Sequence, residues 1–203
     1  MKRVFILCVF AVNMFAVSFA SAAPPPNWRS VDVTQFDIAG VKLGMSYEQT
    51  LTVISEHFRL SPAEIKQVKD STLYSYNRIT KNKQPTSIRV KKDNISVEVS
   101  FLTRIPVNSG DPVAVSFINY SLPNTKENIA TLKEAALSKY GQPSDSRRQA
   151  NLMWCADYNQ ITQCEPRKPK MGLAWSSLVL DDYRLEDAAS KYDQDLLKTK
   201  PSL

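Results

Sequence analysis

Apolar residues occupy every second position in two stretches near the middle of this 203-residue chain. The first set is Ile95, Val97, Val99 and Phe101, and the second is Val113, Val115 and Phe117. Because successive side chains of a strand point to opposite faces of a sheet, this period predicts strands with one face on a hydrophobic core. Turn-forming residues at 92–95 and 108–112 separate the apolar runs, so residues 73–122 are predicted to form an antiparallel meander.

Two helices are predicted before this meander. Ser46 with Gln49 has the pattern of a capping box, and apolar residues at helical spacing follow as far as Phe58. Ser61 with Pro62 marks a second helix start, since proline at the first helical position gives up no hydrogen bond. The second helix is expected to be short.

The order of helix followed by strands returns after the meander. A helix is expected to begin at Asn124 and to end at Gly141, where glycine favours the left-handed conformation that closes helices. A hairpin over 152–164, a strand over 173–180 and a last helix over 182–197 are expected to follow. That last helix is expected to turn an apolar stripe inward, made of Leu185, Ala189, Tyr192 and Leu196.

These elements predict an α+β fold in which helices pack on one face of an antiparallel sheet. The length of the chain suits a single domain of ordinary size, which we place at residues 34–203. Its halves, 34–123 and 124–203, each contain helix followed by strands. Two helix-plus-strands units in tandem are therefore a second description of the same order.

The first 23 residues have the pattern of a signal peptide for export. Lys2 and Arg3 precede an apolar run over 4–19, and the small-residue site Ala20-Ser21-Ala22-Ala23 follows. We expect cleavage after this site, an extended proline-led leader over 24–33, and a periplasmic protein, with secretion from a eukaryotic cell as the alternative. No later stretch is long and apolar enough to cross a bilayer, so no transmembrane segment is expected in the mature chain.

Three cysteines are present, and Cys8 leaves with the signal. Cys155 and Cys164 then remain as an even pair in an oxidising compartment, for which a disulfide bond is predicted. A redox-active pair is the alternative, but dithiol catalysts usually place their cysteines two residues apart at a helix N-terminus. The pair is therefore interpreted as structural.

The mature chain carries a small positive charge. Loss of Lys2 and Arg3 leaves 24 of the 26 basic residues against 20 acidic ones, a net charge of +4. A charge this small gives no reason to expect a nucleic-acid partner. Basic residues nevertheless gather in one segment without an intervening acid, namely Arg78, Lys81, Lys83, Arg89, Lys91 and Lys92.

Two roles are considered for this basic segment, residues 78–92. One is binding of anionic lipid headgroups, lipopolysaccharide or an acidic protein, with each contact near a charged membrane worth about 1 kcal/mol. The other is structural, because lysines on turns and edge strands keep sheets from pairing edge to edge. An acidic C-terminal region over 181–195 would neutralise the segment if the two lay side by side.

The sequence offers no motif for catalysis or metal binding. His57 is the only histidine, and a general base or a zinc site needs further partners that the sequence does not supply. No nucleophile elbow of the Gly-x-Ser-x-Gly type occurs. We therefore expect a protein that is not an enzyme and that uses no metal and no cofactor.

The string Gly40-Val41-Lys42-Leu43-Gly44-Met45-Ser46 resembles the Gly-Met-Ser/Thr helix start of small periplasmic α+β domains. Such domains occur in the lipoprotein subunit of the outer-membrane β-barrel assembly machine. The same helix-then-strands unit, in duplicate, builds the secreted β-lactamase inhibitor proteins. Lys139-Tyr140-Gly141-Gln142-Pro143 resembles the helix end used in these units. The resemblance implies their fold and a tendency to bind proteins, and it assigns no site residue.

The expected function is that of an exported, non-enzymatic module that binds another envelope protein, as an inhibitor or as an accessory or assembly factor. The alternative function is binding of anionic lipid or lipopolysaccharide through the basic segment. The protein-binding function predicts an exposed apolar or aromatic patch. The lipid-binding function predicts affinity that falls steeply with salt.

Overall fold

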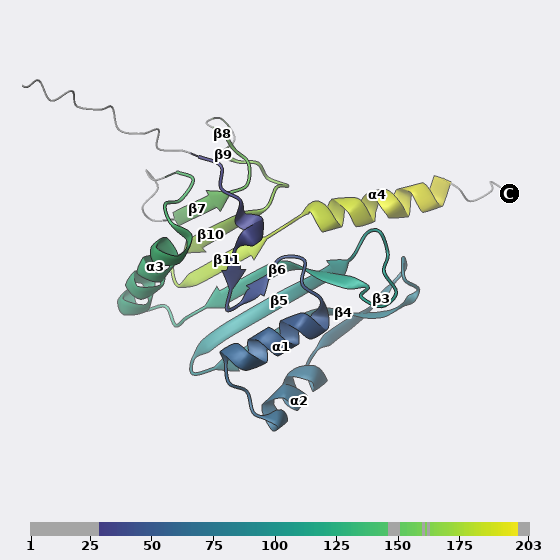
Figure 1. Cartoon of the computed structure of the whole chain (residues 1–203), viewed down its shortest axis with the longest axis horizontal. Coiled ribbons are helices and arrows are strands. Elements are labelled where there is room, and N and C mark those ends of the chain that lie inside the picture. Colours follow the sequence, from purple (N-terminus) through teal and green to yellow (C-terminus); the bar gives the residue numbers. More distant parts are fainter. Residues whose placement is uncertain (1–28, 146–150, 160, 162, 199–203) are drawn as a thin grey trace, which may run out of the picture.

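The computed structural model describes residues 29–145, 151–159, 161 and 163–198 (Figure 1). The signal peptide predicted over 1–23 and residues 24–28 of the leader lie outside this part of the chain. The described residues contain no helix that is long and apolar enough to cross a membrane.

Helices and antiparallel strands alternate along the chain. The helices are the 3₁₀-helix η1 (Val33–Gln35), α1 (Tyr47–His57), α2 (Pro62–Asp70), α3 (Lys126–Tyr140) and α4 (Arg184–Lys198). The main sheet contains β3 (Leu73–Asn77), β4 (Asn82–Lys92), β5 (Ile95–Thr103), β6 (Val113–Ser121), β7 (Asn151–Cys155), β10 (Lys170–Ala174) and β11 (Ser177–Asp181). Two small ribbons pair β1 (Asp37–Ile38) with β2 (Val41–Lys42), and β8 (Tyr158–Asn159) with β9 (Gln163–Cys164).

The main sheet has the strand order β3-β4-β5-β6-β11-β10-β7, and every neighbouring pair is antiparallel. The α+β fold and the meander over 73–122 are thus confirmed. The last strand of the meander, β6, pairs with β11, so the strands of both halves form one continuous sheet. The strands of the second half, β7, β10 and β11, extend this sheet at one end (Figure 1).

The hydrophobic core lies between one face of the sheet and the helices α1, α2 and α3. Alternate residues of β5, such as Val97 and Val99, are fully buried on this face, as the period of two predicts. Trp154 of β7 is also fully buried, and its ring lies edge-on to Tyr140 at the end of α3 with centroids 6.1 Å apart. The indole N–H of Trp154 donates to the carbonyl of Gly141 at 3.1 Å, so this polar group has a partner inside the core.

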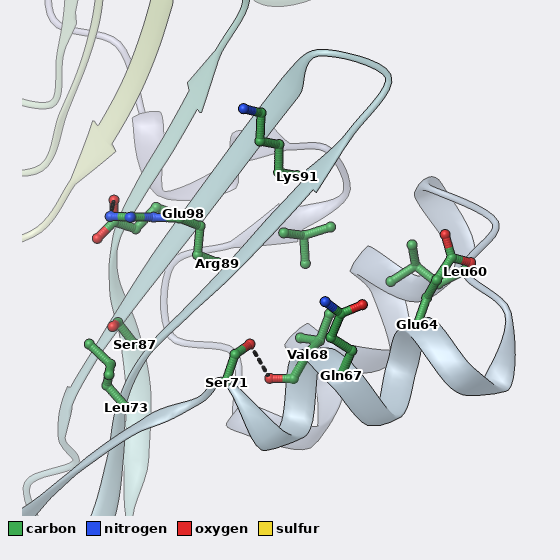
Figure 2. A pocket seen from close by; sticks show the side chains of 11 residues that line it. Leu60, Glu64, Gln67, Val68, Ser71, Leu73, Ser87, Arg89, Lys91 and Glu98 are labelled. Atoms are coloured by element: carbon green, nitrogen blue, oxygen red, sulfur yellow. Dashed lines mark hydrogen bonds and ion pairs between the residues drawn. The ribbon is translucent and has the colours of Figure 1, made fainter.

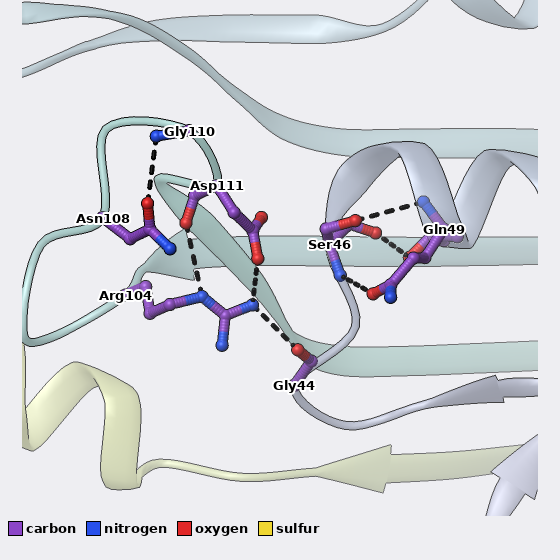
Figure 3. A network of polar contacts seen from close by, with 8 residues as sticks. Gly44, Ser46, Gln49, Arg104, Asn108, Gly110 and Asp111 are labelled. Atoms are coloured by element: carbon purple, nitrogen blue, oxygen red, sulfur yellow. Dashed lines mark hydrogen bonds and ion pairs between the residues drawn. The ribbon is translucent and has the colours of Figure 1, made fainter.

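The predicted start of α1 is confirmed. The Ser46 hydroxyl accepts from the Gln49 N–H at 3.1 Å, and the Gln49 side chain accepts from the Ser46 N–H at 2.9 Å, which completes the capping box (Figure 3). Gly40 has a φ of +80° in the β1–β2 turn, and a Cβ atom there would lie 2.6 Å from Cγ1 of Val53. Glycine is therefore required at position 40 for both backbone conformation and close packing.

A polar network ties the start of α1 to the end of β5. The guanidinium of Arg104 donates to the carboxylate of Asp111 at 2.8 Å and to the carbonyl of Gly44 at 3.0 Å (Figure 3). Gly44 also donates to the carbonyl of Val115 in β6 at 2.8 Å. Residues 44–45 are thus fixed to the edge of the core by hydrogen bonds with Arg104 and with Val115 of β6.

Two predictions about boundaries are wrong. The expected strand over 173–180 is a hairpin, because β10 and β11 meet at a two-residue turn in which Trp175 has a φ of +53°. The sequence has no glycine or asparagine at this position that would predict a turn. Helix α3 is capped by Thr125, whose side chain accepts from Asn128 at 3.2 Å, and not by Asn124.

The apolar stripe predicted to face inward on the last helix is partly exposed. Tyr192 and Leu196 keep 37% and 42% of their surface accessible. The start of α4 lines a hollow with Leu102 and Phe117, whose side chains lie on the sheet face opposite α1. This helix runs out over the meander instead of packing flat on the core (Figure 1).

Candidate functional site

β4 extends beyond β3, the strand that pairs with its outer side. β3 pairs only with Asn82–Ser87, whereas β5 pairs with Ser87–Lys92. In the described part of the chain, residues 88–92 of β4 therefore have a strand on one side only. We call this stretch the open edge.

The backbone groups of the open edge that point outward belong to Arg89 and Lys91. Asp93 and Asn94 form the two-residue turn after β4 with φ angles of 51° and 64°, as in a type I′ turn. Such a turn makes Lys92 and Ile95 a hydrogen-bonded pair, and alternate pairs of the ladder follow the same pattern. Ile88, Val90 and Lys92 hence bond to β5, and the N–H and C=O of the two residues between them face away from it.

Helix α2 forms the other wall beside the open edge. The space between helix and strand is a groove of about 460 Å³ (Figure 2). Leu60 and Val68 line it from the α2 side, and Val90 lines it from β4. Leu73, at the start of β3, lies at one end of the groove with 63% of its surface exposed. The groove thus continues the line of β3 along β4.

Charged groups border the groove. Arg89 forms an ion pair with Glu98 of β5 at 2.8 Å and remains largely exposed, with 68% of its side chain accessible. Lys91 is exposed, and no ion pair joins it to any of the described residues. Its neighbour across the ladder is Ser96, which is uncharged.

Lys92 points to the other face and is held by α2. Its ammonium group donates to the Arg59 carbonyl at 3.3 Å and lies 3.1 Å from the Glu64 carboxylate. Glu64 also accepts from the backbone N–H of Ser61 at 2.6 Å in the capping box of α2. The hydrogen bonds from Ser61, followed by Lys92, lower the pKa of Glu64 to about 2. These contacts hold α2 against β4 at the end of the groove next to the β4–β5 turn.

The opposite edge of the sheet is covered by the chain itself. Along β7, the carbonyl of Met153 accepts from Ser144 N–H at 2.7 Å, and the carbonyl of Cys155 accepts from Val31 N–H at 2.8 Å. The Cys155 N–H donates to the Ser144 hydroxyl at 2.8 Å. Exposed edges invite pairing with other chains. Within the described residues, the chain covers the β7 edge but leaves residues 88–92 of β4 uncovered.

The structure divides the predicted basic segment between the two ends of β4. Arg78, Lys81 and Lys83 lie at the β3–β4 turn, while Arg89, Lys91 and Lys92 lie at the far end. The side chain of Lys92 lies on the other face of the sheet from those of Arg89 and Lys91, as its contacts with α2 show. The six residues therefore do not form one continuous patch.

In the described part of the chain, one ion pair joins the acidic C-terminal region to the basic segment. Asp193 of α4 lies 3.4 Å from the guanidinium of Arg78. Asp187 and Glu186, at the start of α4, instead pair with Arg167. The open edge is thus not neutralised by the ion pairs of α4 in the described residues.

The other sequence candidates are placed elsewhere. Cys155 and Cys164 form the predicted disulfide, which joins the small β8–β9 ribbon to β7 of the main sheet. His57 is exposed at the end of α1, where its ring lies edge-on to Phe58 at 4.9 Å. Trp175 keeps 71% of its surface exposed at the β10–β11 turn. Within the described residues, no group of three or more histidine, cysteine or acidic side chains is placed to hold a metal ion.

The open edge was missed by the sequence analysis because its existence depends on the relative lengths of paired strands. The one sequence signal is Pro85, which lacks a backbone N–H and disturbs the β3–β4 pairing, where the register shifts beside Tyr74.

Comparison of the chain with family models, with curated proteins and with solved structures finds no match.

Proposed function

We propose that this chain is an exported, non-enzymatic module that binds an extended segment of another protein by adding it as a strand to the open edge. The observation that carries this proposal is the outward-facing backbone of Arg89 and Lys91 beside the α2 groove. Strand addition of this kind takes its affinity from main-chain hydrogen bonds and its specificity from pockets for alternate side chains.

The dimensions of the site support this mode of binding. Among the described residues, no strand pairs with the outer side of residues 88–92 of β4, which corresponds to roughly 17 Å of strand. The two outward N–H groups and two outward carbonyls offer four hydrogen bonds. Leu60, Val68 and Val90 supply apolar surface on the α2 side of the same groove. An added strand would therefore gain both the bonds and the burial that recognition requires.

Export is supported by the signal-peptide pattern of residues 1–23 and by the Cys155–Cys164 disulfide, which suits an oxidising compartment. The partner would then be an envelope protein in the periplasm. Whether binding inhibits that partner or assists its assembly is set by which segment the groove captures.

Lys91→Pro tests strand addition, with Lys91→Ala as its matched control. Proline removes the outward N–H but no bond to β5, whereas alanine removes the same charge and keeps the N–H. The mature protein, with a photo-crosslinking side chain at Gln67 in the groove, is incubated with envelope extract. A second copy carries the crosslinker at Glu134, on the exposed side of α3.

The proposal expects polypeptide adducts at Gln67 that are absent at Glu134, that persist in Lys91→Ala and that are lost in Lys91→Pro. Circular dichroism and thermal unfolding of both variants check that the fold is kept. Adducts that survive in Lys91→Pro would exclude strand addition. Phospholipid adducts in place of polypeptide, weakened equally by both variants, would support the lipid-binding alternative and overturn the proposal.

A further inference from the structure

The occupied side of β4 shows which sequence pattern fits its open side. β5 reads Val97-Glu98-Val99 where it pairs with Val90, Arg89 and Ile88. Val97 and Val99 are fully buried on the core face, while Glu98 forms the ion pair with Arg89 on the other face. An apolar, acidic, apolar alternation is thus the pattern that these β4 residues already accept.

The open side presents the same β4 residues with an additional positive charge. Lys91 faces Ser96 on the β5 side, so no carboxylate of β5 lies directly opposite it. Arg89 is 68% exposed, and its guanidinium has donors beyond the one that contacts Glu98. Side chains of an added strand next to Arg89 and Lys91 would lie on this basic face, where opposite charges across a ladder attract.

The other face of an added strand would meet apolar surface. Its residues beside Ile88 and Val90 would point toward α2, where Leu60 and Val68 line the groove. Glu64 of α2, which also lines the groove, is already paired with Lys92 at 3.1 Å. Apolar side chains therefore suit these positions.

From this arrangement we infer that the segment captured at the open edge alternates apolar with acidic residues, its carboxylates lying against Arg89 and Lys91. This inference rests on the proposed function and specifies the chemistry of the partner. A second copy of this chain is a poor occupant of the same edge. Antiparallel self-pairing about Val90 would place Arg89 of one copy opposite Lys91 of the other, and like charges directly opposite are destabilising.

The test uses two blocked, fluorescently labelled heptapeptides. In one, valine alternates with glutamate; in the other, valine alternates with lysine. Anisotropy titrations at low salt measure their affinity for the wild type, Lys91→Glu, Lys91→Ala and Lys91→Pro. Each cross-strand ion pair is expected to strengthen binding by about two- to fivefold. The wild type should therefore prefer the glutamate peptide, Lys91→Glu should reduce or reverse this preference, and Lys91→Pro should bind neither peptide.

The outcomes separate the two proposals. Equal binding of both peptides, lost in Lys91→Pro, would keep strand addition and overturn the acidic specificity. A preference for the lysine peptide in the wild type would overturn the specificity in the same way. Peptide binding that Lys91→Pro leaves unchanged would overturn strand addition itself. A dimer in sedimentation equilibrium that Lys91→Pro dissociates would show that a second copy occupies the edge, and this too would overturn the inference.

Discussion

Arg89 of β4 lies directly opposite Glu98 of β5, and their side chains meet at 2.8 Å. The pair stands on the sheet face away from α1 and beside the open edge. Because Arg89 is 68% exposed and Glu98 is 32% exposed, solvent screens the attraction between them. The pair therefore matters more for orienting Arg89 than for stability.

A double-mutant cycle of Arg89→Ala and Glu98→Ala measures this pair. We expect a coupling energy of about 0.5 kcal/mol at low salt, from urea unfolding of the four proteins. The coupling should shrink at high salt because the charges are partly exposed. A coupling energy of zero at low salt would contradict a formed ion pair.

The pKa of Glu64 predicts how stability depends on acid. Hydrogen bonds from Ser61, and then Lys92, hold this pKa at about 2 in the folded protein, below its ordinary value of 4.5. Since the folded state favours the ionised carboxylate, its stabilisation is present above pH 4.5 and is lost as the pH falls from 4.5 toward 2. Glu64→Gln should flatten the fall of unfolding free energy in this window. Glu134→Gln, which removes the same charge on the exposed side of α3, is the control and should leave the fall as it is.

Local signals in the sequence predicted the helices well. Ser46 with Gln49, and Ser61 with Glu64, form capping boxes in the structure because each motif acts within a single turn of chain. The alternation around Val97 and Val99 likewise predicted a strand with one buried face. These features need no knowledge of distant residues.

Features that depend on distant residues could not be predicted in this way. The β10–β11 turn places Trp175 at a φ of +53°, and the pairing of Ala174 with Ser177 imposes this conformation where the sequence shows no turn residue. The open edge exists because β3 begins only opposite Ser87, a matter of strand register. The contacts of the basic segment, which join Lys92 to α2 and Arg78 to α4, also depend on where these helices lie.

Tyr140 links α3 to the first ribbon. Its hydroxyl donates to the Asp37 carbonyl at 2.6 Å, and its ring lies 4.8 Å from that of Phe36. Tyr140→Phe should lower the free energy of unfolding by about 1 kcal/mol, because the ring contact is kept and the hydrogen bond is lost. Urea unfolding at neutral pH measures this difference, with Tyr192→Phe on the exposed side of α4 as control. No loss in Tyr140→Phe would contradict the hydrogen bond.

The same residue predicts behaviour in alkali. Burial, and then the charge of Asp37, raise the pKa of Tyr140 above its ordinary value of 10.0. The folded state thus favours the neutral phenol, so this stabilisation is complete below pH 10 and is lost as the pH rises above it. As the pH rises above 10, the free energy of unfolding of Tyr140→Phe should therefore fall less steeply than that of the wild type.

The Cys155–Cys164 disulfide closes a short loop, with nine residues of sequence separation. Cys155→Ala with Cys164→Ala should lower the free energy of unfolding by about 2.5–3 kcal/mol, because the open chain regains loop entropy when unfolded. Urea unfolding of the oxidised wild type and the double variant measures this. Reductant serves as the control. It should lower the free energy of unfolding of the wild type by the same amount and should leave that of the double variant unchanged.

Amide hydrogen exchange tests the geometry of the open edge before any partner is known. The N–H groups of Ile88 and Val90 bond to β5, so their exchange should require separation of β4 from β5 and should be slow. The N–H groups of Arg89 and Lys91 face outward and should exchange much faster. Two-dimensional NMR of the free mature protein resolves the four amides individually.

Addition of the peptide in which valine alternates with glutamate should then protect Arg89 and Lys91 while leaving Ile88 and Val90 as they were. This selectivity distinguishes a strand hydrogen-bonded to β4 from a ligand that contacts side chains alone, because only the strand reaches the outward N–H groups. Slow exchange at Arg89 and Lys91 in the free protein would contradict an open edge, and with it the proposed mode of binding.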